Sequence, residues 1–260
     1  MYIGVRGNPD TNRIGEIRKN KSGTPMKIIA YINSDDIDVE FQDEFRYVKT
    51  TTYSNFKMGQ IKNPYDRDLY GVGYHGVGKW KVKDENGKWS RVYLCWRHML
   101  ERCYHAKSAH QYPAYYGICT VCEEWKCFQT FAEWYKAREY ECKGRLHLDK
   151  DIKYPGNTVY SPETCMLVPQ EINALFMNKA NNRGLPNGIR KQGKKYLAKY
   201  NHKDLGTYDT VQEAYDVYSK KKKENIIVKA NEYKDIIPIE AYEAMLNHEF
   251  KIENDRNYVA

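Results

Sequence analysis

Four polar residues in the middle of the chain have the types and spacing that could hold a metal ion. His147, Asp149 and Asp151 alternate with other residues in the stretch LHLDKDI, which begins at residue 146. Residues two apart on a β-strand point to the same face, so a strand here would present these three side chains together. Asn173 closes the phrase TCMLVPQEIN a little further on. The fold must bring these side chains to one place if they are to act together.

The segment between the strand and Asn173 predicts how that happens. A turn containing Pro and Gly follows the strand, and Ser161-Pro162 suits the N-cap and first turn of a helix. This helix would lean Asn173 over the strand. A carboxylate and an amide oxygen on two rigid elements suit a hard divalent cation and leave room for water and a phosphate. The alternative interpretation is an antiparallel strand with ordinary solvent-facing polar residues.

At these residues the chain resembles the HNH (ββα-metal) endonucleases, particularly the phage and intron-encoded homing enzymes. The resemblance rests on the phrase LDKDI…GN…YSPETC…VP…IN and on the preceding W…ML.RCY, and it runs from about residue 78 to residue 176. It implies a hydrolase that nicks or cuts duplex DNA, with Mg²⁺ or Mn²⁺ as cofactor. It also implies that Asp149 and Asn173 bind the metal, and that Asn157 and Thr164 support the loop.

Lys150 departs from the family pattern because it occupies the position of the general-base histidine. A protonated lysine is a poor base, although it could hold the scissile phosphate. His147, on the same face as Asp149, or a metal-bound hydroxide could serve instead, and Asp151 is a further candidate catalytic residue. The alternative function is a DNA-binding accessory or regulatory protein whose HNH core is weakly active or inactive.

A second resemblance begins after residue 176. The phrase NGIRKQGKKYLAKY, followed by LGTYDTVQEAYDVY, is similar to the Apetala (ethylene-response-factor) type of DNA-binding domain. Three strands are predicted near residues 188–192, 195–200 and 204–208, followed by a helix capped by Thr210. The resemblance implies that the sheet enters the major groove of DNA. The residues implied to bind DNA are Arg190, Lys191, Lys194, Lys195, Tyr196 and Lys199.

The charge of the chain favours the same partner. The formal net charge is +8 and the pI is about 8.9. Residues 177–223 hold twelve Lys or Arg against four Asp or Glu, which favours an anionic partner, here double-stranded DNA. No run of about 18 apolar residues and no signal-peptide stretch occurs, which predicts a cytoplasmic protein without membrane contact. The sequence leaves the oligomeric state open, and a monomer is the simplest expectation.

Seven cysteines raise the question of a structural zinc ion. Cys119 and Cys122 form one close pair, but a structural zinc site needs four ligands, usually in two close pairs. The second pair is missing, so the sequence disfavours structural zinc and predicts buried free thiols. An RNA-binding protein with a structural zinc is the third interpretation of the chain.

The predicted fold class is α+β with several domains. We expect a small N-terminal β barrel of the Src-homology type over residues 1–69 and an HNH nuclease core with flanking helices over residues 70–176. The three-stranded sheet plus helix is expected over residues 177–233, and an acidic C-terminal tail helix over residues 234–260. The lysine run SKKKK at residues 219–223 is interpreted as a solvated helix end.

Local patterns add detail to the nuclease core. A helix is predicted from Val92 onward, with Arg102 off its apolar face, and residues 80–89 predict a hairpin with an Asn-Gly turn. A second helix is predicted over residues 121–139. Its large aromatic residues are expected in a hydrophobic core: Trp125, Phe128, Phe131 and Trp134.

Overall fold

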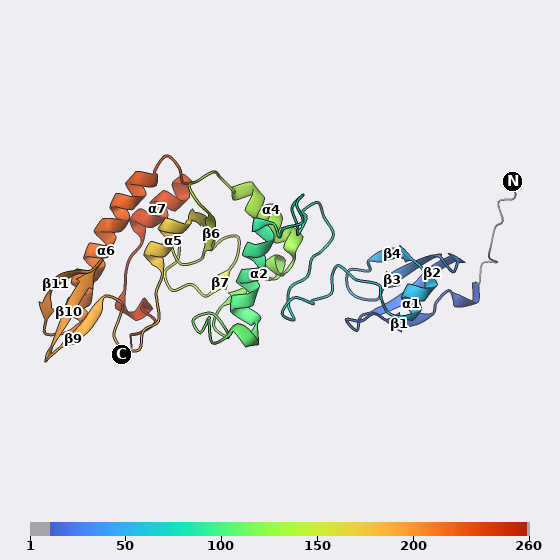
Figure 1. Ribbon diagram of the computed structural model, residues 1–260, viewed down its shortest axis with the longest axis horizontal. Coiled ribbons are helices and arrows are strands. Elements are labelled where there is room, and N and C mark those ends of the chain that lie inside the picture. The colour runs from blue at the N-terminus through green and yellow to red at the C-terminus, as the bar shows by residue number, and fades with distance from the viewer. Residues whose placement is uncertain (1–10, 259–260) are drawn as a thin grey trace. The chain divides into compact units, whose positions relative to one another are not determined.

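The structure, a computed structural model, describes residues 11–258 and is a mixed α/β protein with several small sheets (Figure 1). The chain separates into two compact units. Within the described residues, the first comprises residues 11–80 with 126–129, and the second comprises residues 81–125 with 130–258.

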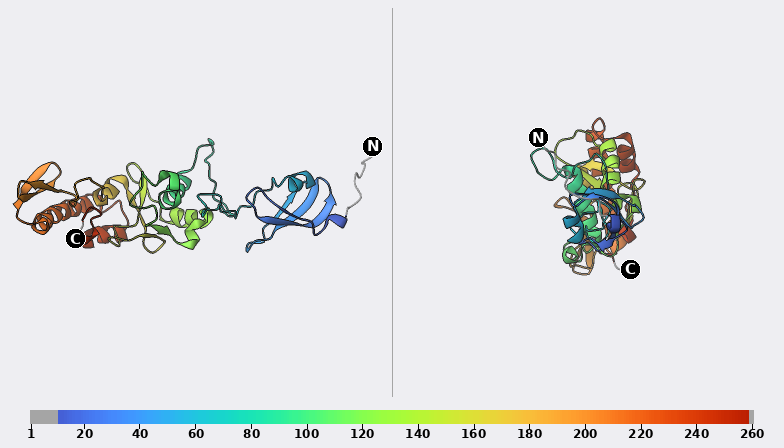
Figure 2. Two further views of the ribbon diagram at one scale, coloured as in Figure 1. Left: turned by 90° about the horizontal axis from the view of Figure 1, so that it is seen from below. Right: turned by 90° about the vertical axis from the view of Figure 1, so that its right-hand side faces the viewer.

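The first unit is built on a four-stranded antiparallel sheet. Its strands follow one another in sequence order: β1 (Ile17–Lys19), β2 (Pro25–Asn33), β3 (Asp36–Phe41) and β4 (Val48–Thr51). Apolar residues alternate along β2 and β3, so one face of the sheet is buried against Phe56 of the short helix α1 (Tyr53–Lys57). The strands form an open sheet in which β1 and β4 are the edges, and Figure 2 shows this sheet in blue. The predicted barrel is therefore wrong, since residues 11–69 form no closed barrel.

Helices with an aromatic core open the second unit. Ser90 caps α2 (Arg91–Tyr104), and its hydroxyl accepts a hydrogen bond from the Tyr93 N–H. The Trp96 indole N–H donates to the Trp125 carbonyl at 2.7 Å, which fixes α2 against the segment after β5 (Thr120–Val121). The helix predicted over residues 121–139 is divided into α3 (Glu123–Lys126) and α4 (Phe128–Arg138). Its four aromatic residues are buried, as predicted.

Two predicted details of this region differ in the structure. The hairpin over residues 80–89 is reduced to one bridge, between Lys83 and Trp89, around a turn at Asp84. Arg102 was placed off the apolar face of its helix, yet its guanidinium donates to the buried Tyr160 hydroxyl at 3.2 Å. The long aliphatic stem of arginine lets this charge reach inward from the edge of the apolar face.

The region of the candidate metal site folds as strand, loop, strand and helix. Strand β6 (Leu146–Asp149) pairs antiparallel with β8 (Met166–Pro169), and helix α5 (Gln170–Phe176) follows at once. Between them, β7 (Val159–Tyr160) pairs in parallel with β5. The helix predicted to open at Ser161 is therefore wrong, because residues 161–164 form a hydrogen-bonded turn and MLVP forms a fully buried strand.

A three-stranded antiparallel sheet lies near the C-terminal end of the chain, and its strands agree closely with the predicted ranges. Its strand order is β11-β10-β9, with β9 (Ile189–Gln192), β10 (Lys195–Tyr200) and β11 (Lys203–Tyr208). Thr210 then caps helix α6 (Val211–Tyr233) through a reciprocal capping box with Glu213. Gly188, at a φ of +80°, precedes β9 where any Cβ would overlap the Tyr218 ring.

Helix α6 is long enough to enter two hydrophobic cores. Near its start, Ala214, Tyr215 and Tyr218 pack with the three-stranded sheet. Further along, Ile226 and Ala230 pack with residues of β8 and α5 and with helix α7 (Ile239–Asn247). The acidic C-terminal segment therefore contributes α7 to a core shared with the β6–β8–α5 region.

The lysine run before the second core does not form a solvated helix end, because α6 continues for ten residues beyond Lys223. Lys222 lies 4.5 Å from the centroid of the Phe250 ring, and the Lys223 ammonium donates to the His248 carbonyl at 2.6 Å. Lys223 thereby satisfies carbonyl groups at the C-terminal end of α7. Two of the four lysines thus make contacts within the fold: Lys222 with an aromatic ring and Lys223 with backbone carbonyls.

Burial lowers the pKa of Lys222 to about 8, and the negative charge of Asp255 opposes this shift only in part. The side chain also lies near Tyr218 and His248. Between about pH 8 and the ordinary lysine value, the unfolded chain holds this proton more tightly than the folded chain. Stability due to this group therefore rises as the pH rises through that interval.

We predict that Lys222→Met makes the protein more stable than the parent at pH 7, because methionine fills the site without a charge. The advantage should shrink by about 1–3 kcal/mol between pH 8 and pH 10, as the parent's lysine loses its proton. Urea unfolding of both proteins across this pH range measures the difference. A difference that stays constant with pH would show that Lys222 is solvated.

Candidate functional site

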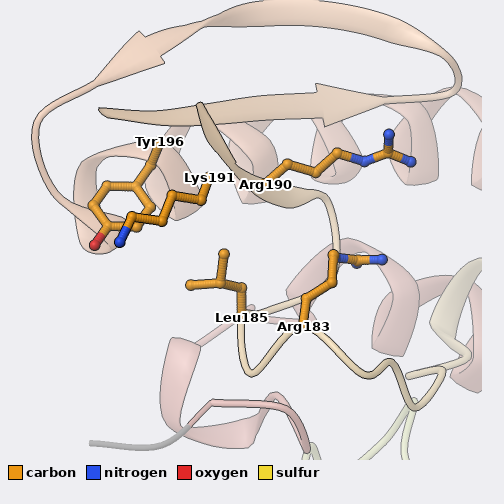
Figure 3. A pocket seen from close by; sticks show the side chains of 5 residues that line it. All are labelled: Arg183, Leu185, Arg190, Lys191 and Tyr196. Atoms are coloured by element: carbon orange, nitrogen blue, oxygen red, sulfur yellow. The ribbon is translucent and has the colours of Figure 1, made fainter. Parts of the chain in front are cut away.

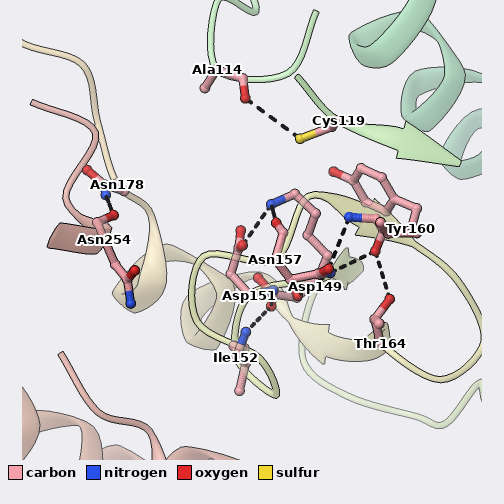
Figure 4. Close-up of polar contacts among 12 residues, drawn as sticks. Ala114, Cys119, Asp149, Asp151, Ile152, Asn157, Tyr160, Thr164, Asn178 and Asn254 are labelled. Carbon is pink, nitrogen blue, oxygen red and sulfur yellow. Dashed lines mark hydrogen bonds and ion pairs between the residues drawn. The ribbon is translucent and has the colours of Figure 1, made fainter. Parts of the chain in front are cut away.

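The centre of the candidate metal site is the carboxylate of Asp149, at the end of β6 (Figure 4). Its Oδ1 accepts backbone N–H groups of Asp151 at 2.8 Å and of Ile152 at 2.7 Å. The chain turns sharply at this point, so the two N–H groups fix the orientation of the carboxylate. Within residues 11–258, no donor forms a hydrogen bond to its other oxygen, Oδ2.

The environment of Asp149 also changes its acidity. Its side chain is buried, and burial together with the neighbouring charge of Asp151 raises the pKa of Asp149 to about 6. The two backbone N–H groups and Lys150 act in the opposite direction. Burying a carboxylate next to another carboxylate is costly unless a cation compensates for it.

Lys150 is turned into the loop that follows β6. Its ammonium donates to Asp151 Oδ1 at 2.7 Å and to the Asn157 carbonyl, and its side chain is only 8% exposed. Burial acts to lower the pKa of Lys150, but the Asp151 charge and hydrogen bond outweigh it, so the net pKa is raised. An ammonium held in this way is a poor proton acceptor.

Asn157 and Thr164 hold the two ends of the same loop. Asn157 donates to the Lys150 carbonyl at 3.0 Å and to the Val159 carbonyl at 2.7 Å, and it accepts the Val159 N–H. The Thr164 hydroxyl donates to the same Val159 carbonyl at 2.7 Å. These contacts connect the segment after β6 to the turn before β8, and Figure 4 shows them as one network.

His147, on strand β6, contacts Asn173, on helix α5. Asn173 lies on α5, and its Nδ2 is 3.4 Å from His147 Nδ1. Because His147 and Asp149 are two residues apart on β6, they face the same side of the strand. Burial, assisted by Arg102 and Arg145, lowers the pKa of His147, so the imidazole is neutral at neutral pH.

Asp151 does not share the strand face as predicted. Strand β6 ends at Asp149, and the carboxylate of Asp151 is instead paired with Lys150. The reason is the turn itself, because the N–H groups of residues 151 and 152 fold back onto Asp149. Asp151 thus neutralises a buried lysine.

The oxygens that remain suit a hard divalent cation. Asp149 Oδ2 and the amide oxygen of Asn173 are the ligand types that Mg²⁺ and Mn²⁺ accept, and such ions keep several waters. Within the described part of the chain, no group of three or more His, Cys, Asp or Glu side chains could hold a metal ion. A cation here would therefore take its remaining ligands from water and from a phosphate. The seven cysteines are free thiols, and three of them are buried.

We predict that Asn157→Ala lowers the free energy of unfolding by about 1–3 kcal/mol, because it removes two donated hydrogen bonds and leaves the carbonyl of the buried Lys150 without this donor. Asn182→Ala is the matched control, since Asn182 is exposed. Urea unfolding of the parent and both variants tests this. Equal stabilities of the two variants would mean that Asn157 does not hold the loop.

The basic residues predicted to bind DNA separate into two groups. Lys195 and Lys199 form ion pairs across the sheet, with Asp209 at 3.0 Å and with Asp204 at 3.1 Å. Arg190 and Lys191, on the edge strand β9, have no carboxylate within ion-pair distance among the described residues. Lys194 is exposed in the turn between β9 and β10. The unpaired cations therefore gather at the β9 edge.

A pocket of about 600 Å³ opens at this edge (Figure 3). Arg190 and Lys191 line it with Tyr196, which stands opposite Lys191 on the neighbouring strand. Arg183 and Leu185, from the segment between α5 and β9, form its other wall. Sequence reasoning missed these two residues, because NNRGLPNG has the composition of a linker and its shape depends on distant contacts.

Residues 254–257 near the C-terminal end, here called the C-terminal clamp, hold that linker in place. Asp255 accepts the Asn187 N–H at 3.0 Å, and Asn257 accepts the Asn181 N–H at 2.8 Å. The Asn257 amide also donates to the Lys179 carbonyl. Asp255 and Asn257 are both buried. The pocket wall therefore owes its position to residues far along the chain.

We predict that Asp255→Ala releases the linker and exposes it to trypsin, which cuts after exposed Lys or Arg. Cleavage after Lys179 or Arg183 should become at least several times faster than in the parent, because a buried hydrogen-bonded charge is lost. Glu253→Ala, at an exposed position, is the control. If the two variants are cut at the same rate, the clamp does not order the linker.

Comparison of the chain with protein-family models, with curated proteins and with solved structures finds no match. The function must therefore be argued from the geometry of the chain itself. Across the described residues, no helix is both long enough and apolar enough to cross a membrane.

Proposed function

We propose that the chain is a metal-dependent DNA endonuclease of the HNH type, which hydrolyses phosphodiester bonds in duplex DNA as a phage homing-type enzyme. The observation that carries the proposal is the sequence of elements β6, loop, β8 and α5. In this arrangement Asn173 on the helix contacts His147, which lies two residues along β6 from the oriented carboxylate of Asp149. The same order of elements is what the resemblance to HNH nucleases implies.

In this proposal Asp149 and Asn173 present the oxygens that bind the metal. Asp149 is held by two backbone N–H groups, and Asn173 is held by the rigid packing of α5 in the shared core, where Ile172 is fully buried. A bound Mg²⁺ or Mn²⁺ would polarise the phosphodiester and stabilise the charge on its leaving oxygen.

His147 is the proposed acceptor of the proton from the attacking water, since it is the imidazole that faces the same side of β6 as Asp149. The Asn173 Nδ2–H donates to His147 Nδ1 over 3.4 Å, so Nδ1 carries the lone pair of the neutral ring and would take the proton once this long contact opens. Lys150 has a different role in this scheme. Its ion pair with Asp151 and its bond to the Asn157 carbonyl stabilise the loop that orients Asp149.

DNA is the proposed partner because the chain is positively charged and because its unpaired positive charges lie in the same unit as the proposed catalytic residues. The net charge is +8, and the unpaired cations Arg190 and Lys191 lie on a sheet edge in the same compact unit as the proposed catalytic residues. Phosphate contacts would supply affinity, and side chains on the strands would read base edges.

A second candidate function is a DNA-binding accessory protein with little or no nuclease activity. Two observations favour it. Lys150 stands where the resemblance places a general base, and it is engaged in an ion pair. No third acidic or histidine ligand joins Asp149 among the described residues. Both functions share the DNA-binding surface, so cleavage separates them.

We predict that the parent nicks or cuts supercoiled plasmid only with Mg²⁺ or Mn²⁺, and that chelation by EDTA stops the reaction. Asp149→Ala and Asn173→Ala should each lower the cleavage rate by roughly a hundredfold or more, because each removes a proposed metal ligand, while duplex binding in EDTA stays unchanged.

Asp235→Ala and Asn182→Ala are matched controls at exposed positions and should cut at the parental rate. Cleavage by the two site variants at the parental rate would place the active site elsewhere. Binding by the parent without any metal-dependent cleavage would instead establish the accessory function.

A further inference from the structure

We propose that the pocket at the β9 edge binds one nucleotide of a DNA strand that has left the duplex, together with its flanking phosphates. The inference rests on the proposed DNA-binding function and deepens it, because it assigns a single-stranded substrate segment to one place. The pocket residues are Arg183, Leu185, Arg190, Lys191 and Tyr196.

The charges of the pocket favour an anion. Arg183, Arg190 and Lys191 bring three positive charges to one cavity, and no carboxylate among the described residues pairs with them. The neighbouring lysines of the same sheet, Lys195 and Lys199, are neutralised by aspartates. Unpaired cations around one opening repel one another, and bound phosphates relieve that repulsion with charge-assisted hydrogen bonds.

The arrangement of these charges favours two phosphates. Figure 3 shows the guanidinium groups of Arg183 and Arg190 on one side of the opening. The Lys191 ammonium lies on the other side, beside the Tyr196 hydroxyl, and Leu185 lies between the two sides. Successive phosphates of one DNA strand present two negative charges separated by a sugar and its base. This alternation of charge, apolar unit and charge matches the pocket.

The size and lining of the pocket favour a nucleoside between those phosphates. Its volume of about 600 Å³ is far larger than a phosphate group and falls among sites that hold small organic molecules. Leu185 and Tyr196 are half-buried and give it an apolar and an aromatic surface. Tyrosine rings bind bases of any type by stacking, and such contacts require a base that is unstacked from its neighbours.

The wall that carries Arg183 and Leu185 is held firmly enough to serve as a binding surface. The linker is fixed on both sides of these residues, since Asn181 and Asn187 are bonded to the C-terminal clamp. Asn181 also donates to the Leu185 carbonyl at 2.9 Å. A preformed wall reduces the entropy lost when a flexible strand binds.

The test measures the binding of fluorescent oligonucleotides to the full chain in EDTA, so that no cleavage intervenes. The probes are a single-stranded oligothymidylate and a duplex of equal length. Arg183→Ala should weaken single-strand binding roughly fivefold at about 0.1 M salt and flatten the slope of log affinity against log salt by about 0.7, because one phosphate contact is lost. Its effect on duplex binding should equal that of the control.

Lys203→Ala is the matched control, since it removes an exposed charge from the same sheet outside the pocket. Tyr196→Phe should keep single-strand affinity and Tyr196→Leu should lower it, because only the former retains a ring. Asp149→Ala should bind the single strand as the parent does, so loss of cleavage and loss of this site are separate results.

Two outcomes would overturn the proposal. Equal effects of Arg183→Ala and Lys203→Ala on oligothymidylate binding would mean that the pocket makes no special contact. Alternatively, Arg183→Ala could weaken duplex and single strand equally, which would assign Arg183 to the duplex backbone.

Discussion

The burial of helix α6 in two hydrophobic cores is the constraint on which the second unit depends. Positions 214, 218, 222, 226 and 230 are four residues apart and form one stripe along the helix. The start of the stripe lies on the three-stranded sheet, and its end lies on β8, α5 and α7. Each fully buried side chain such as Ile226 contributes about 2 kcal/mol through the hydrophobic effect. Helix α6 therefore connects the proposed DNA-binding sheet to the region of the proposed catalytic residues.

Buried charge is the second theme of this unit, and it follows from that arrangement. Lys222 occupies the middle of the stripe, where α6 passes between the two cores, so its ammonium must lie among aromatic rings. Lys150 is buried beside Asp149 but has a carboxylate partner in Asp151. The two lysines show opposite pKa shifts for this reason, since burial dominates at Lys222 and the ion pair dominates at Lys150.

Local signals allowed much of the fold to be predicted from the sequence. The strands of the C-terminal sheet and the Thr210 cap are fixed by alternation and by a capping box within a few residues, and both are present. The predictions that were wrong concern segments whose structure depends on contacts with distant parts of the chain. Ser161-Pro162 has a helix-start pattern, but Thr164 closes it as a turn, and the apolar run MLVP becomes a buried strand because β6 pairs with it. In the candidate site, the sequence predicted that His147 and Asn173 come together. It did not predict the ion pair of Asp151 with Lys150, because that pair depends on the turn at Asp149.

The contact between the C-terminal clamp and the linker also has a consequence for biosynthesis. The bonded residues Asn181 and Asn257 are separated by 76 positions in the chain, and those positions include the three-stranded sheet and both helices α6 and α7. A nascent chain can form the sheet and its helix by local pairing while translation continues. The linker becomes fixed only after residues 254–257 have left the ribosome exit tunnel. The pocket at the β9 edge is thus completed later than the sheet that lines it, and a nascent chain that still lacks the C-terminal clamp does not present the finished pocket.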